Sequence, residues 1–586
     1  MGTRLLRILP WLLAVVVTVI AWRAPNQLFT DARGTLLVSQ SVVDHGTVSL
    51  SGYKAERGED YRTWGYRYQF FETPEGEVLY AYPLGNSLVA VPAIWLARQL
   101  GYDMFEIADA RAWHQGLAAL TLGAAFLLVY ALSRIWLPRS VALAWAVAFT
   151  LGTSLASTAG TVLWGQTGLL LWSLAALWLL LDPRFAERRV WAVLGGFCLF
   201  LVFIARPHGA FIIAAVLGYL LLCDRRRLPW AVLGSLPPLL AYLAVFYPLY
   251  HELPGTHYYS GTSFELSWHF VQILAYGVLF SPSRGLFVFS PVLLVVLVLA
   301  VVYARRLPDK RKLLIPAVVI PAYLVLIASW EYWEGGWSFG PRLLADCLPG
   351  WALLGPLALA AWRTDAVAVR RAVGGVALLV TGAFSVWVNA VQGLYNPSTL
   401  AWNGVQNLNE RREILWDWRF AQFLATPERL ERQRQALDRR DIVPAQPGEP
   451  LPVTHPGLSF GAGWHGLEHS PDGDFRWSSA APNRLTLRHE LLRALPRGQP
   501  LRIRFTAGTF GGEKKVVVLL HGQAVAEWAH PDNGVYELTL SPEQWQTMGD
   551  LTLELHVPGA QSPSAVSDSP DTRTLGLWLR VIYLGG

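Results

Sequence analysis

The chain has 586 residues, of which 53% are hydrophobic and only 15% are charged. This balance argues against a soluble protein and predicts a polytopic membrane protein. The net charge of +6 belongs to the first two thirds, because residues 1–395 hold 29 Lys and Arg against 21 Asp and Glu, whereas residues 396–586 hold 19 against 21. Outside the loops that flank predicted spans there is no basic tract interleaved with aromatic residues, so nothing favours a nucleic acid as partner.

The first apolar run, residues 5–22, predicts an uncleaved membrane anchor. Arg4 and Arg7 precede it and no small-residue cleavage site follows it, so we expect a cytoplasmic N-terminus. Further runs are long enough to cross roughly 30 Å of hydrocarbon, and they cover residues 112–133, 141–160, 163–181, 190–205, 209–222, 229–250, 286–304, 313–330, 342–361 and 372–391. With a shorter run after Pro83, the sequence predicts 11–13 spans.

Clusters of Arg and Lys between spans predict the orientation, because such clusters mark cytoplasmic loops. They are Arg184, Arg188 and Arg189; Arg225, Arg226 and Arg227; Arg305, Arg306, Lys310, Arg311 and Lys312; and Arg363, Arg370 and Arg371. The segments predicted to face the exterior are then residues 23–82, 206–209, 251–285 and 331–341 and everything after about residue 395. The N-terminus is thus predicted to be cytoplasmic and the part after about residue 395 to lie on the exterior side.

The predicted spans do not all fit this orientation. Four apolar segments separate the exterior loop at 23–82 from the cytoplasmic loop at 182–189, although an odd number of crossings is required. One of them is therefore expected to be short, re-entrant or fused with its neighbour. The two candidates are residues 83–99 and the stretch 152–166, which is rich in small and polar residues. Irregular backbone at membrane depth is tolerated only where protein buries it or where it lines a cavity.

The fold class is therefore mainly α, a polytopic membrane module over residues 1–395, followed by two parts of soluble character. Residues 396–443 form a connector in which the charged segment 410–441 has helical spacing and predicts one or two amphipathic helices. After a proline-rich linker, residues 444–586 alternate apolar and polar residues, which predicts an all-β, sandwich-like domain. The expected strands are 484–488, 501–505, 515–520, 535–540, 551–557 and 575–583.

Asp31 is the most informative ionisable residue, because it lies about nine residues beyond the first span. A carboxylate held at the membrane surface can act as a general base or bind a divalent cation. The alternative is a structural Asp that caps a helix over residues 33–44. The first loop continues through a Tyr-rich stretch with a hairpin expected at Pro74-Glu75-Gly76, and it ends at Tyr82-Pro83-Leu84-Gly85.

These landmarks resemble the GT-C superfamily of glycosyltransferases, in the bacterial branch of protein O-mannosyltransferases and the lipid A aminoarabinose transferase. The resemblance rests on Asp31, the helix that contains residues 39–46 and the Tyr-Pro-Leu-Gly re-entry. Two later segments agree, namely residues 280–291, which include Ser281-Pro282-Ser283-Arg284-Gly285, and residues 333–342. Together they span most of residues 1–395.

The resemblance implies transfer of a sugar from a polyprenyl-phosphate carrier to a hydroxyl acceptor on the exterior face, with inversion at the anomeric carbon. It also implies a bacterial inner membrane, with the C-terminal part of the chain in the periplasm. Asp31 would be the general base. Arg342, Arg206 and Arg284 would bind the anionic lipid phosphate, since a guanidinium holds phosphate bidentately. A snorkelling role near the interface is the alternative for each arginine.

The chain departs from its relatives at two positions. Tyr82 stands where relatives carry a Lys before the Pro, and Gln166 stands where many carry an acid or a His. Both changes leave the carrier and any divalent cation open, and both residues remain expected ligand contacts. His208 is a further phosphate candidate, with a turn residue as the alternative.

Trp333, Glu334 and Trp337 are expected to contact the sugar or the acceptor, and an interfacial aromatic belt explains the same residues. The expected partners are the lipid-linked donor, a cell-envelope acceptor (protein, lipid or glycan) and membrane lipids. Two other functions fit the sequence, a lipid-linked sugar flippase or transporter and a non-catalytic envelope assembly protein.

Overall fold

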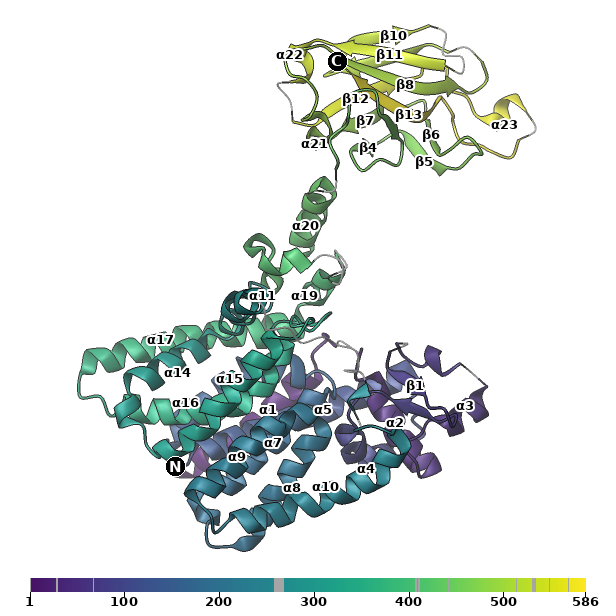
Figure 1. Ribbon diagram of the computed structural model, residues 1–586. Helices are drawn as coiled ribbons and strands as arrows, with labels where there is room; N and C mark the ends of the chain where they lie inside the picture. Colours follow the sequence, from purple (N-terminus) through teal and green to yellow (C-terminus); the bar gives the residue numbers. More distant parts are fainter. Residues whose placement is uncertain are drawn as a thin grey trace. The chain divides into compact units, whose positions relative to one another are not determined.

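The computed structural model describes residues 2–27, 30–58, 60–66, 68–253, 255–257, 268–405, 408, 412–440, 442–512, 514–529, 534–546, 549–567 and 569–585. The chain divides into two compact units, Met1–Leu430 and Glu431–Gly586. The first is helical and the second is built from strands, so the predicted fold class is confirmed (Figure 1).

The first unit is a bundle of apolar helices. Its members are α1 (Gly2–Trp22), α5 (Ile107–Ser133), α6 (Arg139–Leu151), α7 (Gly165–Leu181), α8 (Arg189–Ala205), α9 (Ala210–Cys223), α10 (Leu228–Tyr250), α14 (Pro291–Val302), α15 (Leu314–Ala328), α16 (Leu348–Arg363) and α17 (Ala368–Val386). The closest packing joins α7 and α10 to α8, α1 to α5, and α16 and α17 to α14. These contacts bury one continuous apolar core.

Within the described part of the chain, five helical segments are long and apolar enough to cross a membrane. They are Ile107–Ser133, Leu228–Tyr250, Lys310–Ala328, Arg342–Arg363 and Ala368–Tyr395, and seven shorter apolar helices of 10–17 residues accompany them. Most of the shorter ones coincide with predicted spans. The first unit is therefore that of an integral membrane protein, and the orientation and the number of spans stay predictions.

The two segments suspected of irregularity differ from each other. Residues 152–164 are buried and contain a π-helical turn, η2 (Leu155–Ala159), between α6 and α7. The backbone of this stretch is therefore irregular and enclosed by protein, as irregular backbone at membrane depth requires, and its expected failure to cross the membrane stays a prediction. By contrast, α4 (Gly85–Gln99) is a regular helix that packs against α2 (Arg33–His45).

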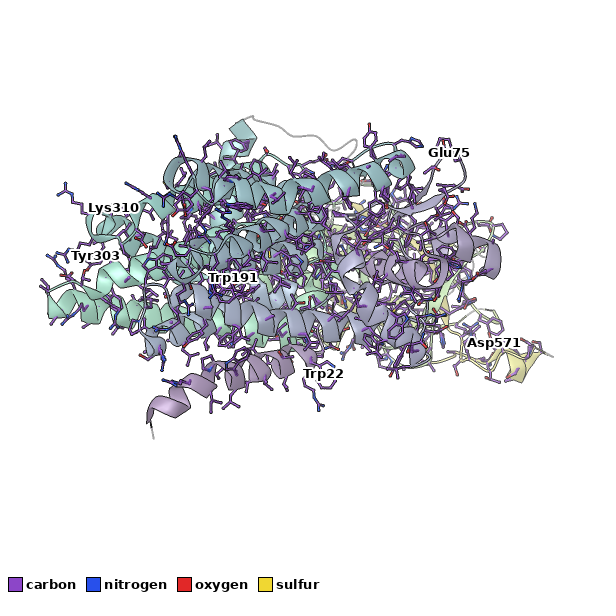
Figure 2. All side chains as sticks on the ribbon, turned by 90° about the horizontal axis from the view of Figure 1, so that it is seen from below. Trp22, Glu75, Trp191, Tyr303, Lys310 and Asp571 are labelled. Atoms are coloured by element: carbon purple, nitrogen blue, oxygen red, sulfur yellow. The ribbon has the colours of Figure 1, made fainter. Side chains whose placement is uncertain are left out.

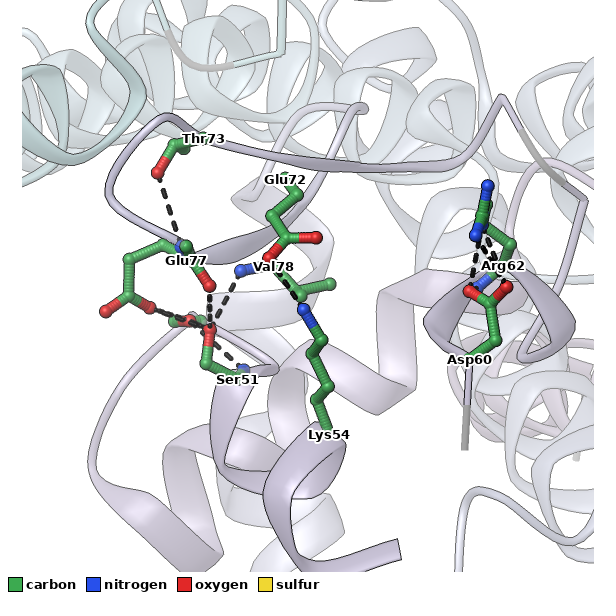
Figure 3. Close-up of polar contacts among 10 residues, drawn as sticks. Ser51, Lys54, Asp60, Arg62, Glu72, Thr73, Glu77 and Val78 are labelled. Atoms are coloured by element: carbon green, nitrogen blue, oxygen red, sulfur yellow. Dashed lines mark hydrogen bonds and ion pairs between the residues drawn. The ribbon is translucent and has the colours of Figure 1, made fainter. Parts of the chain in front are cut away.

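The loop after α1 folds into a small layer of its own. It contains α2, α3 (Ser51–Arg57) and the hairpin of β1 (Phe70–Glu72) and β2 (Val78–Tyr80), which confirms the predicted turn at Pro74-Glu75-Gly76. Ser51 Oγ donates to Glu77 and accepts from the Val78 amide, and Lys54 pairs with Glu72 at 2.6 Å (Figure 3). These contacts fix the hairpin on α3.

The hairpin and one of the basic loops lie at opposite ends of the helical unit. Figure 2 shows Glu75 at one end and Tyr303 and Lys310 at the other. The same separation was predicted from the distribution of Arg and Lys, which placed residues 23–82 and residues 305–312 on opposite sides of the membrane.

Parts of the first unit are less regular than the sequence predicts. The short elements α11 (Trp268–Gln272), α12 (Val278–Phe280) and α13 (Leu286–Phe289) lie between α10 and α14, and α18 (Gly393–Tyr395) and α19 (Ser398–Ala401) come after α17. In the segment 410–441, three 3-10 turns over 412–424 precede one regular helix, α20 (Pro427–Arg440). Leu415 and Phe423 from the 3-10 turns are buried in apolar clusters, and residues 410, 411 and 441 lie outside the described residues.

The second unit is a sandwich of two antiparallel sheets. One has the order β10-β9-β12-β7-β4 and the other β11-β8-β13-β6-β5, with β3 paired to β13. The strands are β3 (Pro450–Pro452), β4 (Leu458–Phe460), β5 (Trp464–Glu468), β6 (Phe475–Ser478), β7 (Asn483–Leu487), β8 (Leu501–Thr509), β9 (Val516–Leu520), β10 (Gln523–Trp528), β11 (Gly534–Leu540), β12 (Leu551–His556) and β13 (Leu577–Gly585).

All six predicted strands are present in this sandwich, as β7, β8, β9, β11, β12 and β13. Alternate residues of these strands point into the shared core, as in β12, where Leu551, Leu553 and Leu555 are fully buried. The alternation that predicted them is therefore the one that fills the space between the sheets.

Candidate active site

A cavity of about 740 Å³ with a partly polar lining lies in the first unit. Its walls come from the segment before α2, from the hairpin strand β2, from the turn between α6 and α7, and from the segments 330–343 and 412. Ten site residues were expected from the sequence. Six of them line the cavity: Asp31, Tyr82, Gln166, Arg206, Trp337 and Arg342.

Asp31 and Arg342 form an ion pair at the cavity wall, with Arg342 Nη1 3.0 Å from Asp31 Oδ2. Tyr68 donates its hydroxyl to the other carboxylate oxygen at 3.2 Å, and the Tyr80 hydroxyl donates to the Asp31 carbonyl. The N-cap position of α2 is Ala32 and has no side-chain cap, so the capping alternative for Asp31 is wrong. The carboxylate is held by a guanidinium and a phenol instead.

Arg342 keeps part of its hydrogen-bonding capacity. Its Nη2 donates to the Gly335 carbonyl at 2.9 Å, and its guanidinium lies 4.5 Å from the centre of the Trp164 ring. Arg342 Nε is buried and has no acceptor among the described residues. A buried donor of this kind is costly unless a ligand or water satisfies it.

Arg206 lines the same cavity and is held from behind by an acid. Its Nε lies 3.0 Å from Asp346 Oδ2, and the two side chains are 7% and 0% exposed. Asp346 belongs to η9 (Arg342–Cys347), the turn that leads into α16, and it does not line the cavity. The pair therefore presents a cation to the cavity while the counter-charge stays in the protein.

Arg412 is the third lining arginine, and it repeats this arrangement. Its Nε lies 3.5 Å from Glu334 Oε1, and the Glu334 side chain is 1% exposed. Burial raises the pKa of Glu334 from its usual range, and the cation of Arg412 opposes that effect. Three arginines thus face the cavity, and Asp31 is the one carboxylate among the described lining residues.

Arg284 does not line the cavity. Its guanidinium makes five hydrogen bonds: to the carbonyls of Ser283, Glu334 and Gly336 and to the side chains of Gln422 and Asn403. A guanidinium has five N–H groups. Arg284 therefore fixes the 334–336 loop from behind, and burial lowers its pKa to about 9.

The other expected residues are divided between wall and interior. Gln166 is buried at the start of α7 and Trp337 is 41% exposed, and both line the cavity with Tyr82. Trp333 lies outside the lining and packs against Trp416 at 5.5 Å. The His208 side chain does not line the cavity, and its carbonyl accepts from the Tyr323 hydroxyl at 2.8 Å.

Sequence analysis missed several residues that build the cavity. Asp346 carried a signal, because an ionisable residue inside an apolar run is by itself a functional candidate. Arg412 carried none, since it lies in a segment dense in charge. The remaining lining residues that were missed are mainly aromatic or polar: Thr30, Tyr66, Tyr68, Tyr80, Asn86 and Trp164.

No group of three or more His, Cys, Asp or Glu side chains suited to a metal ion occurs among the described residues. The single lining carboxylate, Asp31, could supply one oxygen ligand alongside oxygens of a bound phosphate. The cavity itself contributes cations and hydrogen-bond donors instead, a set that suits an anionic ligand.

The fold and the cavity together define an integral membrane protein with an arginine-rich, aromatic-lined cavity and a β-sandwich domain. No family model matches the sequence, and no curated protein matches it. Among solved structures, the chain is similar to the Archaeoglobus fulgidus oligosaccharyltransferase tethered with an acceptor peptide containing the NVT sequon via a disulfide bond, with a TM-score of 0.38 and 12% identity. The similarity covers 70% of this chain and 59% of that one, less than two thirds of its length.

Proposed function

We propose that the chain is a GT-C-type glycosyltransferase that moves a sugar from a polyprenyl-phosphate carrier to a hydroxyl group of a cell-envelope acceptor. The observation that carries this proposal is the Asp31–Arg342 pair at the wall of the cavity, with Arg206 and Arg412 on the same wall. One carboxylate and several guanidinium groups are the two kinds of charge that such a reaction needs.

In the proposed step, Asp31 accepts the proton of the acceptor hydroxyl as its oxygen attacks the anomeric carbon. The bond between that carbon and the phosphate oxygen breaks, and its electron pair stays on the phosphate. Attack from the face opposite the leaving group inverts the anomeric centre. The guanidinium groups stabilise the charge that grows on the departing phosphate, so they favour the transition state over the ground state.

Arg342 changes partner in this mechanism. Its guanidinium is bound to Asp31 and Gly335, and its Nε has no acceptor among the described residues. A donor phosphate competes with Asp31 for Nη1 and supplies the acceptor that Nε lacks. The exchange frees the carboxylate to take up a proton when the donor is in place.

The size and lining of the cavity fit this class of ligand. About 740 Å³ lies within the range of small-molecule sites, roughly 300–1,000 Å³. Exposed rings such as Trp337 and Tyr332 supply faces on which a sugar ring can stack. We place the cavity on the exterior side of the membrane, because its lining segments are those predicted to lie opposite the basic loops.

The test is transfer of labelled sugar from a purified polyprenyl-phosphate donor by the full-length protein in proteoliposomes. Asp31→Asn keeps the size of the side chain and removes its charge and the base, which should lower the rate by about 10²–10⁴-fold. Arg342→Ala should raise the donor concentration needed for half-maximal rate by about 10–150-fold, because it removes charge-assisted hydrogen bonds to the phosphate.

An Arg–Asp pair in the same loop provides the matched control. Arg62 and Asp60 pair at 2.9 Å on an exposed turn that does not line the cavity (Figure 3). Asp60→Asn and Arg62→Ala should leave the rate unchanged. Full activity of Asp31→Asn would refute the proposed base. Movement of intact donor across the membrane without transfer, unaffected by Asp31→Asn, would favour a flippase instead.

A further inference from the structure

A second large space in the first unit lies apart from the cavity described above. It is a groove of about 830 Å³ whose walls come from α1, from α5, from the start of α6 and from the segment that follows α7. Lys312 Nζ lies 4.8 Å from the ring centre of Trp136, and the Trp136 indole donates to Asp309 at 2.9 Å. The loop after α5 therefore adjoins the basic loop that Figure 2 shows at the end opposite Glu75.

The groove has a cationic rim. Arg7, Arg134, Arg139 and Arg184 line it, and the one acid among its lining residues is Asp182. Asp182 is bound by Arg184 at 2.5 Å, which leaves three lining arginines without a carboxylate partner in the described structure. Arg7 and Arg139 have no ion pair with any described residue, so the rim carries an excess of positive charge.

The rest of the groove is apolar. Below the arginines its wall consists of Pro10 and Trp11 on α1 and of Ala124, Leu127 and Leu128 on α5. From Ala124 to Arg134 the wall follows α5 for ten residues, or about 15 Å at 1.5 Å per residue. One leaflet of a bilayer has a hydrocarbon thickness of about 15 Å, half of roughly 30 Å.

From these two halves we propose that the groove binds an anionic glycerophospholipid. Its phosphate is held by Arg7 and Arg139 at the rim, and one acyl chain lies along Trp11, Ala124 and Leu128. Charge complementarity selects the headgroup, because guanidinium groups between membrane helices bind anionic lipid headgroups. The groove lies at the end of the bundle predicted to be cytoplasmic, and the site is independent of the proposed sugar transfer.

The test measures lipid binding to the full-length protein by native mass spectrometry. Dioleoyl phosphatidylglycerol is compared with dioleoyl phosphatidylcholine, which has the same chains and no net charge. We expect phosphatidylglycerol to be retained about tenfold more strongly, since one charge-assisted contact accounts for at least that factor. The double variant Arg7→Gln/Arg139→Gln should lose this preference and keep its affinity for phosphatidylcholine.

Two further variants test whether the effect is specific to the rim arginines and whether the apolar wall contributes to binding. Arg226→Gln/Arg311→Gln removes the same charge from exposed arginines that do not line the groove, and it should leave the preference intact. Ala124→Phe fills the groove from an exposed position of α5 without changing its charge, and it should also weaken phosphatidylglycerol binding.

Each contrary result overturns the proposal in its own way. Equal retention of the two lipids, or an equal loss in Arg226→Gln/Arg311→Gln, would mean that no specific site exists. Unchanged phosphatidylglycerol binding by Ala124→Phe would show that no acyl chain lies in the groove. Displacement of the lipid by millimolar glycerol phosphate would identify a site for soluble anions. All variants are first compared by thermal unfolding, and a misfolded Arg7→Gln/Arg139→Gln is replaced by Arg139→Gln alone.

Discussion

The buried pair of Arg206 and Asp346 allows the electrostatics of the site to be tested without any substrate. Asp346→Asn keeps the shape of the side chain and removes its charge, so Arg206 is left as a buried cation whose carboxylate is gone. Both side chains are almost fully buried and their charged atoms are 3.0 Å apart. Breaking such a pair from one side costs about 3–5 kcal/mol.

A double-mutant cycle distinguishes this cost from a general loss of packing. Arg206→Gln should cost a similar amount, because it leaves Asp346 without its cation. The double variant Arg206→Gln/Asp346→Asn contains no buried charge and two amides able to bond to each other, so most of the loss should be recovered. The coupling energy should then be several kcal/mol.

The assay is unfolding of the full-length protein in mixed micelles, followed by far-ultraviolet circular dichroism. Additive losses in the double variant would refute the inference that the two charges compensate each other. Added polyprenyl phosphate supplies an anion to Arg206, so it should raise the unfolding midpoint of Asp346→Asn more than that of the wild type. An equal rise of the unfolding midpoint in both proteins would show that Arg206 does not bind the phosphate.

Two other predictions concern backbone and pH. A Cβ on Gly34 would come within 2.3 Å of the Tyr80 ring, so Gly34→Ala should lower stability by about 1–3 kcal/mol and slow the proposed sugar transfer. Gly116 has open space around it, so Gly116→Ala should do neither. Equal melting points of the two variants would contradict this prediction. Burial lowers the pKa of His455, whose Nδ1 accepts from the Gly457 amide at 3.0 Å. When the turn opens, the His455 imidazole is exposed and binds a proton more readily, so the turn should lose stability as pH falls below about 6.5. The measurement is the amide exchange rate of the turn, corrected for intrinsic rates, which should rise at low pH. His455→Gln should abolish this rise.

The strands of the second unit show what alternation can and cannot predict. β12 alternates apolar and polar residues over its length, whereas β13 is mostly apolar and its alternation of buried and less buried residues breaks at Arg580 and Val581. Both strands were expected from the sequence. β5 (Trp464–Glu468) has Gly466 in its centre and no fully buried residue, so its pattern carries no signal of an inward face. Its place in the sheet comes from pairing with β6 across a register shift, a tertiary effect that local sequence does not encode.

The candidate site divides in a similar way. Asp31 could be found because its distance from the first span is set by the chain itself. Whether an arginine near a helix end reaches the cavity could not be predicted, since Arg284 and Arg342 lie in similar sequence surroundings. Arg284 is surrounded by five acceptors, one from its neighbour Ser283 and four from three distant segments, and Arg342 faces the cavity. Which of the two meets a ligand depends on side chains more than 50 residues away.

The placement of the acids decides how the three lining arginines respond to an anion. Asp346 and Glu334 lie behind the wall, so a phosphate in the cavity adds to their pairs with Arg206 and Arg412 without displacing them. Asp31 lies on the wall itself, and the same phosphate competes with it for Arg342. In the proposed mechanism, binding of the anion is therefore coupled to release of one carboxylate, that of Asp31, which is the proposed base. This coupling depends on Asp31 lining the cavity while Asp346 and Glu334 lie behind its wall. Loss of the Asp31 carboxylate from the wall should therefore reduce the coupling more than loss of Arg206 or Arg412.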